Sequence, residues 1–148
     1  MPQSAISLLA PAMQKWTADQ HWAKLRPIQE KAIPVILRGG SDVIISAATA
    51  SGKTEAAFLP IGSLLITKPA SSLGALCLSP LKALINNQAE RLAGIFRDTG
   101  VPVTAWHGDA GWETKRNFLE CPRGILLITP ESLETLLMRH NTWCRAAF

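Results

Sequence analysis

The sequence has few cysteines, and their spacing suits neither a metal site nor a disulfide framework. Cys77, Cys121 and Cys144 are odd in number and far apart, no CxxC pair occurs, and none of the three histidines is clustered with them. A zinc site or a set of disulfides would need paired or regularly spaced ligands. Reduced thiols are therefore expected, as is usual for cytosolic proteins.

Long apolar runs and an N-terminal targeting signal are also missing. No apolar stretch approaches the length that spans a bilayer. The N-terminus lacks a basic stretch followed by an apolar core, so a secretory signal is not indicated. We expect an intracellular, soluble protein in the cytoplasm, with no membrane partner.

The remaining composition is that of an ordinary globular domain. The 148 residues are 47% hydrophobic and 18% charged, which is one domain's worth of chain with enough apolar residues for a core. The 15 Lys and Arg against 11 Asp and Glu give a net charge of +4. This mild excess is compatible with a polyanionic partner, but many proteins without nucleic-acid partners share it.

Residues 46–54, SAATASGKT, have the features of a phosphate-binding loop. They follow the apolar run Val43-Ile44-Ile45 and precede the helix-favouring segment Glu55–Leu59. Small residues let backbone N–H groups turn inward around a polyphosphate, and the following helix presents its positive end to the same anion. Lys53 would reach the outer phosphates and the Thr54 hydroxyl would ligate magnesium. The alternative is a chance Gly-Lys-Thr at a helix start, with a solvated lysine.

The usual loop begins with Gly four residues before Gly52-Lys53-Thr54, and this sequence has Ala47 there. With Thr49, these residues resemble motif I of superfamily 2 helicases, which commonly begins with Ala and carries Thr two places on. The resemblance implies ATP and Mg²⁺ as cofactors. It gives Lys53 and Thr54 the catalytic roles, with Thr54 as the metal ligand through ATP.

Periodicity and turn residues predict alternating helices and strands. Ser4 is a possible cap of the first helix, residues 17–26 form a turn or short helix, and Pro60 and Gly62 would break or bend the third helix. Helices are predicted at residues 4–16, 27–38, 53–66, 80–99, 111–119 and 130–139, and strands at 42–46, 73–78, 101–106 and 125–128.

This alternation predicts an α/β fold with a parallel sheet and helices on both faces. The resemblance implies a RecA-like P-loop domain that is incomplete at its C-terminus. Residues 1–40 would be N-terminal helices with a Q-motif-like segment, and residues 41–148 a partial RecA-like ATP-binding domain. Ligands of such sheets bind beyond the C-terminal strand ends.

The segment Arg26-Pro27-Ile28-Gln29 resembles the Q-motif region of DEAD-box and related helicases. There Gln29 would bond the adenine edge, because an amide donates and accepts at once. Trp16 and Trp22 are candidates for stacking on adenine. The alternative makes Gln29 a surface helix residue. The residues assigned to nucleotide binding are Gln29, Ala47, Thr49, Ala50, Ser51, Gly52, Lys53, Thr54 and Glu55.

Leu78–Gln88 resembles motif Ia of the Lhr-like and Ski2-like groups, in which backbone amides and a basic side chain at a helix start grip the phosphates of one strand. Pro80 and Lys82 occupy the matching positions. A helix N-terminus with a flexible cation suits a phosphate, which fixes position without reading sequence. The alternative is an ordinary capped helix with a solvated Lys82.

Ile128–Leu133 resembles motif Ib, whose Thr contacts the nucleic-acid backbone. Thr129 can cap the following helix and contact a phosphate at the same time. His107-Gly108-Asp109 resembles the segment between motifs Ia and Ib in Lhr-like proteins, which abuts the same strand. The resemblance thus adds His107, Gly108 and Thr129 to the strand contacts, although His107 alone would more often be a loop histidine.

Motif II (DExx) of this family is missing, because no two acidic residues are adjacent anywhere in the sequence. The second RecA-like domain, which carries the arginine finger and would be this chain's partner in the full-length protein, is missing too. An arginine finger alone is worth about a thousandfold or more in rate. We therefore expect the chain to bind nucleotide weakly at best and scarcely to hydrolyse it.

The leading interpretation is the N-terminal part of an ATP-dependent superfamily 2 DNA or RNA helicase, closest to Lhr-like members. It would bind ATP–Mg²⁺ at the phosphate loop and a single-strand backbone through motifs Ia and Ib. A second interpretation is a truncated, non-hydrolysing module of RecA-like fold that binds nucleic acid or protein. A third is a small-molecule P-loop kinase, against which the motif Ia and Ib matches argue.

Overall fold

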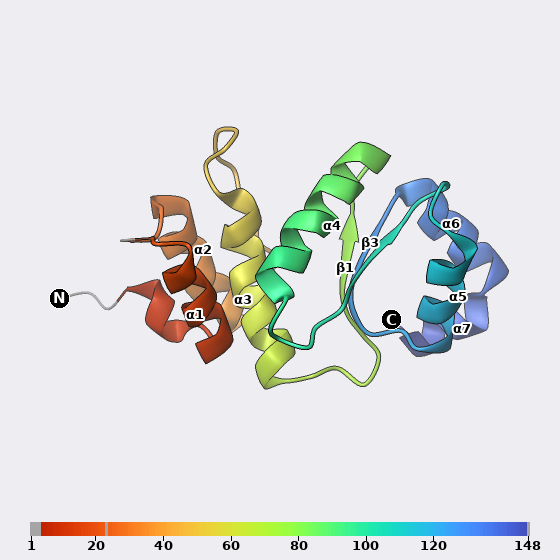
Figure 1. The fold of residues 1–148 in the computed structure, drawn as a ribbon, viewed down its shortest axis with the longest axis horizontal. Coiled ribbons are helices and arrows are strands. Elements are labelled where there is room, and N and C mark those ends of the chain that lie inside the picture. Colours follow the sequence, from red (N-terminus) through yellow and green to blue (C-terminus); the bar gives the residue numbers. More distant parts are fainter. Residues whose placement is uncertain (1–3, 23, 148) are drawn as a thin grey trace. The chain divides into compact units, whose positions relative to one another are not determined.

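The computed structural model describes residues 4–22 and 24–147, so Ala23, within the predicted turn at 17–26, lies outside the described residues. Contacts divide the chain into two compact units, Met1–Lys68 and Pro69–Phe148, and each unit is described by itself (Figure 1). The division at residues 40 and 41 stays a prediction. Within the described residues, no helix is long and apolar enough to cross a membrane.

The first unit is helical. Its elements are the 3₁₀ helix η1 (Ala5–Leu8) and the helices α1 (Pro11–Asp19), α2 (Pro27–Arg38) and α3 (Lys53–Thr67). The Ser4 cap is confirmed, because its side chain accepts a hydrogen bond from the backbone N–H of Ile6. A single helix over residues 4–16 is wrong: Pro11 begins a new helix, since proline has no N–H to continue the earlier one and its φ suits a first turn.

Helix α3 is continuous from Lys53 to Thr67, so of the break or bend predicted near Pro60 and Gly62 the break does not occur. Both residues are buried, and the packing around them offsets the hydrogen bond that proline removes. Met13, Ile33 and Leu59 are fully buried, so α1, α2 and α3 share this core.

The strand predicted at residues 42–46 is absent, and this segment has no regular secondary structure. Ile44 is 93% exposed. Its apolar side chains favour a strand, but a strand also needs a neighbour that pairs its N–H and C=O groups. The described part of the first unit contains no strand that could pair with this segment.

The second unit holds a parallel sheet, which confirms the predicted α/β class. Its strands are in the order β1-β3-β2, and β3 pairs in parallel with both neighbours (Figure 1). The elements are β1 (Leu73–Leu78), α4 (Lys82–Phe96), β2 (Val103–Trp106), α5 (Trp112–Glu120), β3 (Gly124–Ile128), α6 (Pro130–Arg139) and α7 (Asn141–Ala147). The predicted boundaries of β1 and α6 are confirmed, whereas α4 begins at Lys82 rather than Pro80.

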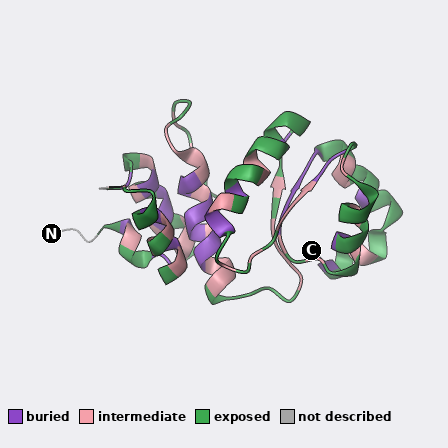
Figure 2. Ribbon diagram, viewed as in Figure 1, coloured by how far each residue is buried: buried purple, intermediate pink, exposed green. Residues whose placement is uncertain are grey.

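The core of this unit lies on both faces of β3, whose residues 125–128 are fully buried (Figure 2). Leu126 and Ile128 alternate along the strand and therefore share one face, where they pack in a cluster with Trp106 and Phe118. Helices α5, α6 and α7 cover that face, and α4 covers the other (Figure 1). The Cys144 thiol, in the same cluster, has a raised pKa because of its burial.

Candidate ATP and nucleic-acid sites

The phosphate loop, residues 46–54, forms a turn that leads into α3. The Ser51 N–H donates to the Ala48 carbonyl at 3.3 Å, and Ala50 and Gly52 have φ values of 59° and 89°. Gly52 is the N-cap of α3 and supplies no side chain to the helix start. The first N–H groups of α3 thus lack a side-chain cap, which is the arrangement that favours an anion.

The ammonium of Lys53 lies against the loop's own carbonyls. Its Nζ donates to the carbonyl oxygens of Ala47 and Ala48, both at 2.8 Å. Ser51 Oγ is buried and has no hydrogen-bond partner among the described residues. Leaving a buried hydroxyl unpaired costs about 1–3 kcal/mol. The loop therefore carries a lysine ammonium bound to its own carbonyls and, two positions earlier, a buried hydroxyl that has no hydrogen-bond partner among the described residues.

Gln29 and Arg26 tie the start of α2 to this loop. Gln29 is 1% exposed, so it is not a surface helix residue. Its Oε1 accepts from the Arg26 N–H at 2.9 Å, and its Nε2 donates to the Gly52 carbonyl at 3.4 Å. The Arg26 guanidinium donates to the Ala50 carbonyl. A Cβ at Gly52 would lie 2.6 Å from Gln29 Nε2, so this approach needs glycine.

The other residues predicted around the nucleotide are variously placed. Thr49 is exposed, Thr54 is half-buried in the first turn of α3, and Glu55 beside it is 3% exposed. Trp16 and Trp22 pack edge to face, with ring centroids 5.4 Å apart. Within residues 4–22 and 24–147, no group of three His, Cys, Asp or Glu side chains could hold a metal ion by itself.

The residues of the second unit that are predicted to contact a nucleic-acid strand lie together at the C-terminal ends of its three β-strands. The Ser79 N–H donates to the Ile128 carbonyl, and the Thr129 N–H donates to the Trp106 carbonyl. The segments that follow the three β-strands therefore lie side by side. We call Pro80, Lys82, His107, Gly108, Asp109 and Thr129 the strand-end surface. Sequence reasoning grouped these segments correctly, because parallel strands end at one edge.

Lys82 is the first residue of α4, and an acidic partner holds its ammonium. Leu81, the N-cap, is extended and offers no side-chain cap. Lys82 Nζ lies 2.7 Å from Asp109 Oδ2, and the two side chains are 53% and 74% exposed. The hydrogen bond and the charge of Lys82 lower the pKa of Asp109, so the carboxylate is ionised at neutral pH. The pairing joins residues 27 positions apart, and nothing in the local sequence signals it.

His107 is buried beside this pair. It is 8% exposed, its Nε2 lies 2.9 Å from Asn86 Oδ1, and its Nδ1 has no hydrogen-bond partner among the described residues. The imidazole thus links the end of β2 to α4. Its predicted contact with a nucleic-acid strand stays a prediction. Thr129 is the N-cap of α6, as predicted: its Oγ1 accepts from the Ser132 N–H at 3.3 Å.

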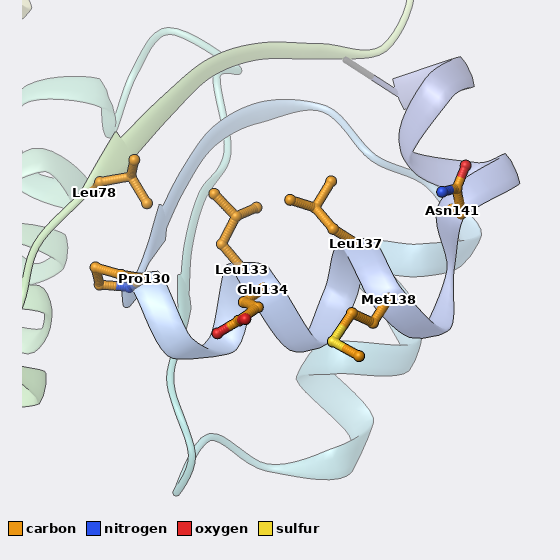
Figure 3. Close-up of a pocket in the computed structure, with 7 residues that line it drawn as sticks. All are labelled: Leu78, Pro130, Leu133, Glu134, Leu137, Met138 and Asn141. Carbon is orange, nitrogen blue, oxygen red and sulfur yellow. The ribbon is translucent and has the colours of Figure 1, made fainter.

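Two hollows flank α6 in the second unit. One, of about 450 Å³, lies between α6 and the end of β1 and is mostly apolar (Figure 3). Figure 3 shows Leu78, Leu133 and Leu137 pointing into it. The other, of about 480 Å³, lies between α5 and α6 and mixes apolar with charged and hydroxyl side chains. Sequence reasoning missed both, because each is shaped by side chains from elements distant in the chain.

A family profile described as "DEAD/DEAH box helicase" matches residues 26–146. The chain belongs to this family. The resemblance to superfamily 2 helicases is thereby confirmed, and the kinase interpretation is set aside. The match includes the phosphate loop, Gln29 and the whole strand-end surface.

Two curated relatives and one solved structure show how widely the likeness extends. The chain is 34% identical to DEAD-box ATP-dependent RNA helicase 26 of Oryza sativa subsp. japonica, covering 85% of this chain and 24% of the relative. It is 31% identical to ATP-dependent helicase Lhr-Core of Sulfolobus acidocaldarius, covering 88% and 16%. The structure of Mycobacterium smegmatis helicase Lhr bound to ssDNA and AMP-PNP matches at 28% identity and a TM-score of 0.75, covering 91% and 18%. The chain therefore spans about a quarter or less of these proteins.

Proposed function

We propose that this chain is the part of an ATP-dependent superfamily 2 helicase that binds ATP–Mg²⁺ at the phosphate loop and a single-strand backbone at the strand-end surface. The observation that carries the proposal is the Lys53 ammonium, held by two loop carbonyls next to the uncapped start of α3. The similar Mycobacterium smegmatis protein, whose structure contains ssDNA and AMP-PNP, supports both halves of it.

The loop residues fit a triphosphate. Lys53 exchanges the Ala47 and Ala48 carbonyls for phosphate oxygens, which are stronger acceptors because they are charged. Ser51 Oγ, which has no partner in the described part of the chain, gains one, and Thr54 offers its hydroxyl to the metal. Gln29 keeps one N–H and one lone pair free beyond its bonds to Gly52 and Arg26, and these can read the adenine edge. Bound ATP–Mg²⁺ would supply the phosphoanhydride bond whose hydrolysis drives a helicase.

The strand-end surface fits phosphates. Lys82 releases Asp109 and turns to a phosphate oxygen, while the N–H groups of the first turn of α4 face the same anion. The Thr129 hydroxyl, which donates to Ser132 Oγ in this structure, can donate to a second phosphate instead, and it still accepts from the Ser132 N–H. Contacts of this kind fix position and carry no sequence information. We assign binding to this chain and turnover to the protein that joins it to a DExx segment and a second RecA-like domain.

Single-strand-stimulated ATP hydrolysis by that joined protein tests the proposal. Turnover that rises when a single strand is added is the expected result. Binding of the strand without any turnover would favour the truncated binding module instead, and binding of neither ATP nor strand would overturn both interpretations.

Replacing Lys82 with alanine should weaken single-strand binding equally across sequences. The salt dependence should fall as well, because each phosphate contact contributes about 0.7 to the slope of log K against log salt for single strands. Fluorescence anisotropy with oligonucleotides of different sequence, over a series of salt concentrations, measures both effects. Arg97→Ala is the matched control, since it removes an exposed cation just beyond the other end of α4. An unchanged salt slope would show that Lys82 does not contact a phosphate of the bound strand.

Asp109 should compete with phosphate for Lys82. Asp109→Asn keeps the shape but removes the charge, so single-strand affinity should rise about two- to fivefold, the scale of an exposed ion pair. The gain should vanish in a Lys82→Ala background. Asp98→Asn, an exposed aspartate beyond the far end of α4, is the control. A loss of affinity in Asp109→Asn would show instead that the carboxylate positions the lysine for binding.

A further inference from the structure

We propose that the hollow between α5 and α6 is a side pocket that holds one nucleotide of the bound strand, with its base on the apolar floor and its phosphate on the flanking cations. This inference rests on the proposed strand binding and adds a site to it. The pocket belongs entirely to the second unit, and its volume of about 480 Å³ is within the range of small-molecule sites.

The floor of the side pocket suits a base. Trp106 and Leu136 line it, and both are buried members of the core cluster, being 8% and 2% exposed. Their positions are therefore held by packing and do not depend on a ligand. Aromatic and apolar surfaces bind any base through its face, so such a floor tolerates every sequence.

The walls of the side pocket suit a phosphate. Ser132, Thr135 and Arg139 lie at positions i, i+3 and i+7 of α6, which places them on one face, and Lys115 lies across from them on α5. Lys115 donates to the Gly108 carbonyl at 3.3 Å. Among the described residues, neither Lys115 nor Arg139 is in an ion pair. Glu131 is the acidic lining residue, and these two cations outnumber it.

The side pocket continues the strand-end surface. Gly108 belongs to both, and Ser132, at the pocket wall, bonds through Oγ to Thr129 Oγ1 at 3.0 Å. A nucleic-acid strand that is bound at Lys82 and Thr129 therefore passes directly beside the pocket. The hollow in Figure 3 differs in this respect: its lining includes Glu134 but no lysine or arginine, so it offers no cation to a phosphate.

An abasic scan with a pocket-filling variant tests the proposal in the full chain. Single-stranded DNA and RNA oligonucleotides are cut to the shortest length that binds, so that the strand cannot shift its register. Each carries an abasic site at a different position and is titrated into wild type and Thr135→Phe. Thr135 is exposed, so phenylalanine fills the pocket without replacing a core side chain. Thr142→Phe is the matched control, because Thr142 is an exposed threonine on α7 that does not line the pocket. Thermal unfolding confirms that the variants fold.

One abasic position should weaken wild-type binding by about fivefold, the lower end of the scale for one stacked base, because only a small part of Trp106 is uncovered. Thr135→Phe should lower the affinity for the intact strand by a similar factor, and in this variant the same abasic site should cause no further loss. Thr142→Phe should behave as wild type. Arg139→Ala should lower the salt slope by about 0.7, in contrast to Arg145→Ala on α7.

The result also separates this inference from the proposed function. Equal tolerance of all abasic positions, or wild-type affinity in Thr135→Phe, overturns the side pocket. If Lys82→Ala still lowers affinity and salt slope in that case, the strand-end surface stands and only the pocket is wrong. Absence of any single-strand binding by the wild-type protein would overturn the strand-binding part of the proposed function.

Discussion

Lys53→Ala should abolish ATP turnover in the protein that joins this chain to its catalytic segments. The ammonium lies 2.8 Å from the carbonyl oxygens of Ala47 and Ala48, inside the turn that would wrap a triphosphate. Removing one preorganised donor from developing charge typically lowers kcat by about 100- to 1,000-fold. Steady-state ATP hydrolysis with saturating single strand measures the loss.

The control for this prediction is Lys68→Ala, which removes a lysine at the opposite end of the same helix. Its turnover should match that of wild type. Lys53 is not in the core, so its variant should also unfold at close to the wild-type temperature. Undiminished hydrolysis by a folded Lys53→Ala protein would exclude the phosphate-loop role.

Gly124→Ala should destabilise the second unit by about 3 kcal/mol. Gly124 opens β3 with a φ of 73°, a conformation that costs other residues roughly 1–3 kcal/mol. A Cβ there would lie 2.1 Å from the Pro102 carbonyl oxygen, which already accepts the Ile125 N–H at 2.9 Å. The backbone must shift to relieve this contact, and overpacking of this kind costs about another 1–3 kcal/mol. Urea unfolding followed by circular dichroism measures the free energy of unfolding.

Gly94→Ala, in α4 of the same unit, is the matched control with the opposite expected sign. A Cβ at Gly94 meets nothing within 4 Å, and alanine favours a helix interior by about 1 kcal/mol over glycine. If Gly124→Ala unfolded at the same urea concentration as wild type, the tight approach of Pro102 to β3 would be wrong.

Local signals predicted the elements that carry the site. Gly52-Lys53-Thr54 marks the start of α3, and Thr129-Pro130 marks the start of α6, because caps and first-turn residues act within one helical turn. The apolar runs of β1 and β3 were equally clear, since buried parallel strands are apolar throughout. Residues 42–46 are just as apolar and yet form no strand, because pairing depends on a neighbour that the segment itself does not contain.

The sequence by itself determined the family, the start of α3 at Lys53 and the grouping of three segments at one sheet edge, because spacing and helix caps are local and parallel strands share an end. Only the tertiary structure decided which groups meet there. It pairs Lys82 with Asp109, buries His107 against Asn86, and encloses the side pocket between α5 and α6. Each of these contacts joins side chains from separate elements, and their distances follow from how the helices pack on the sheet.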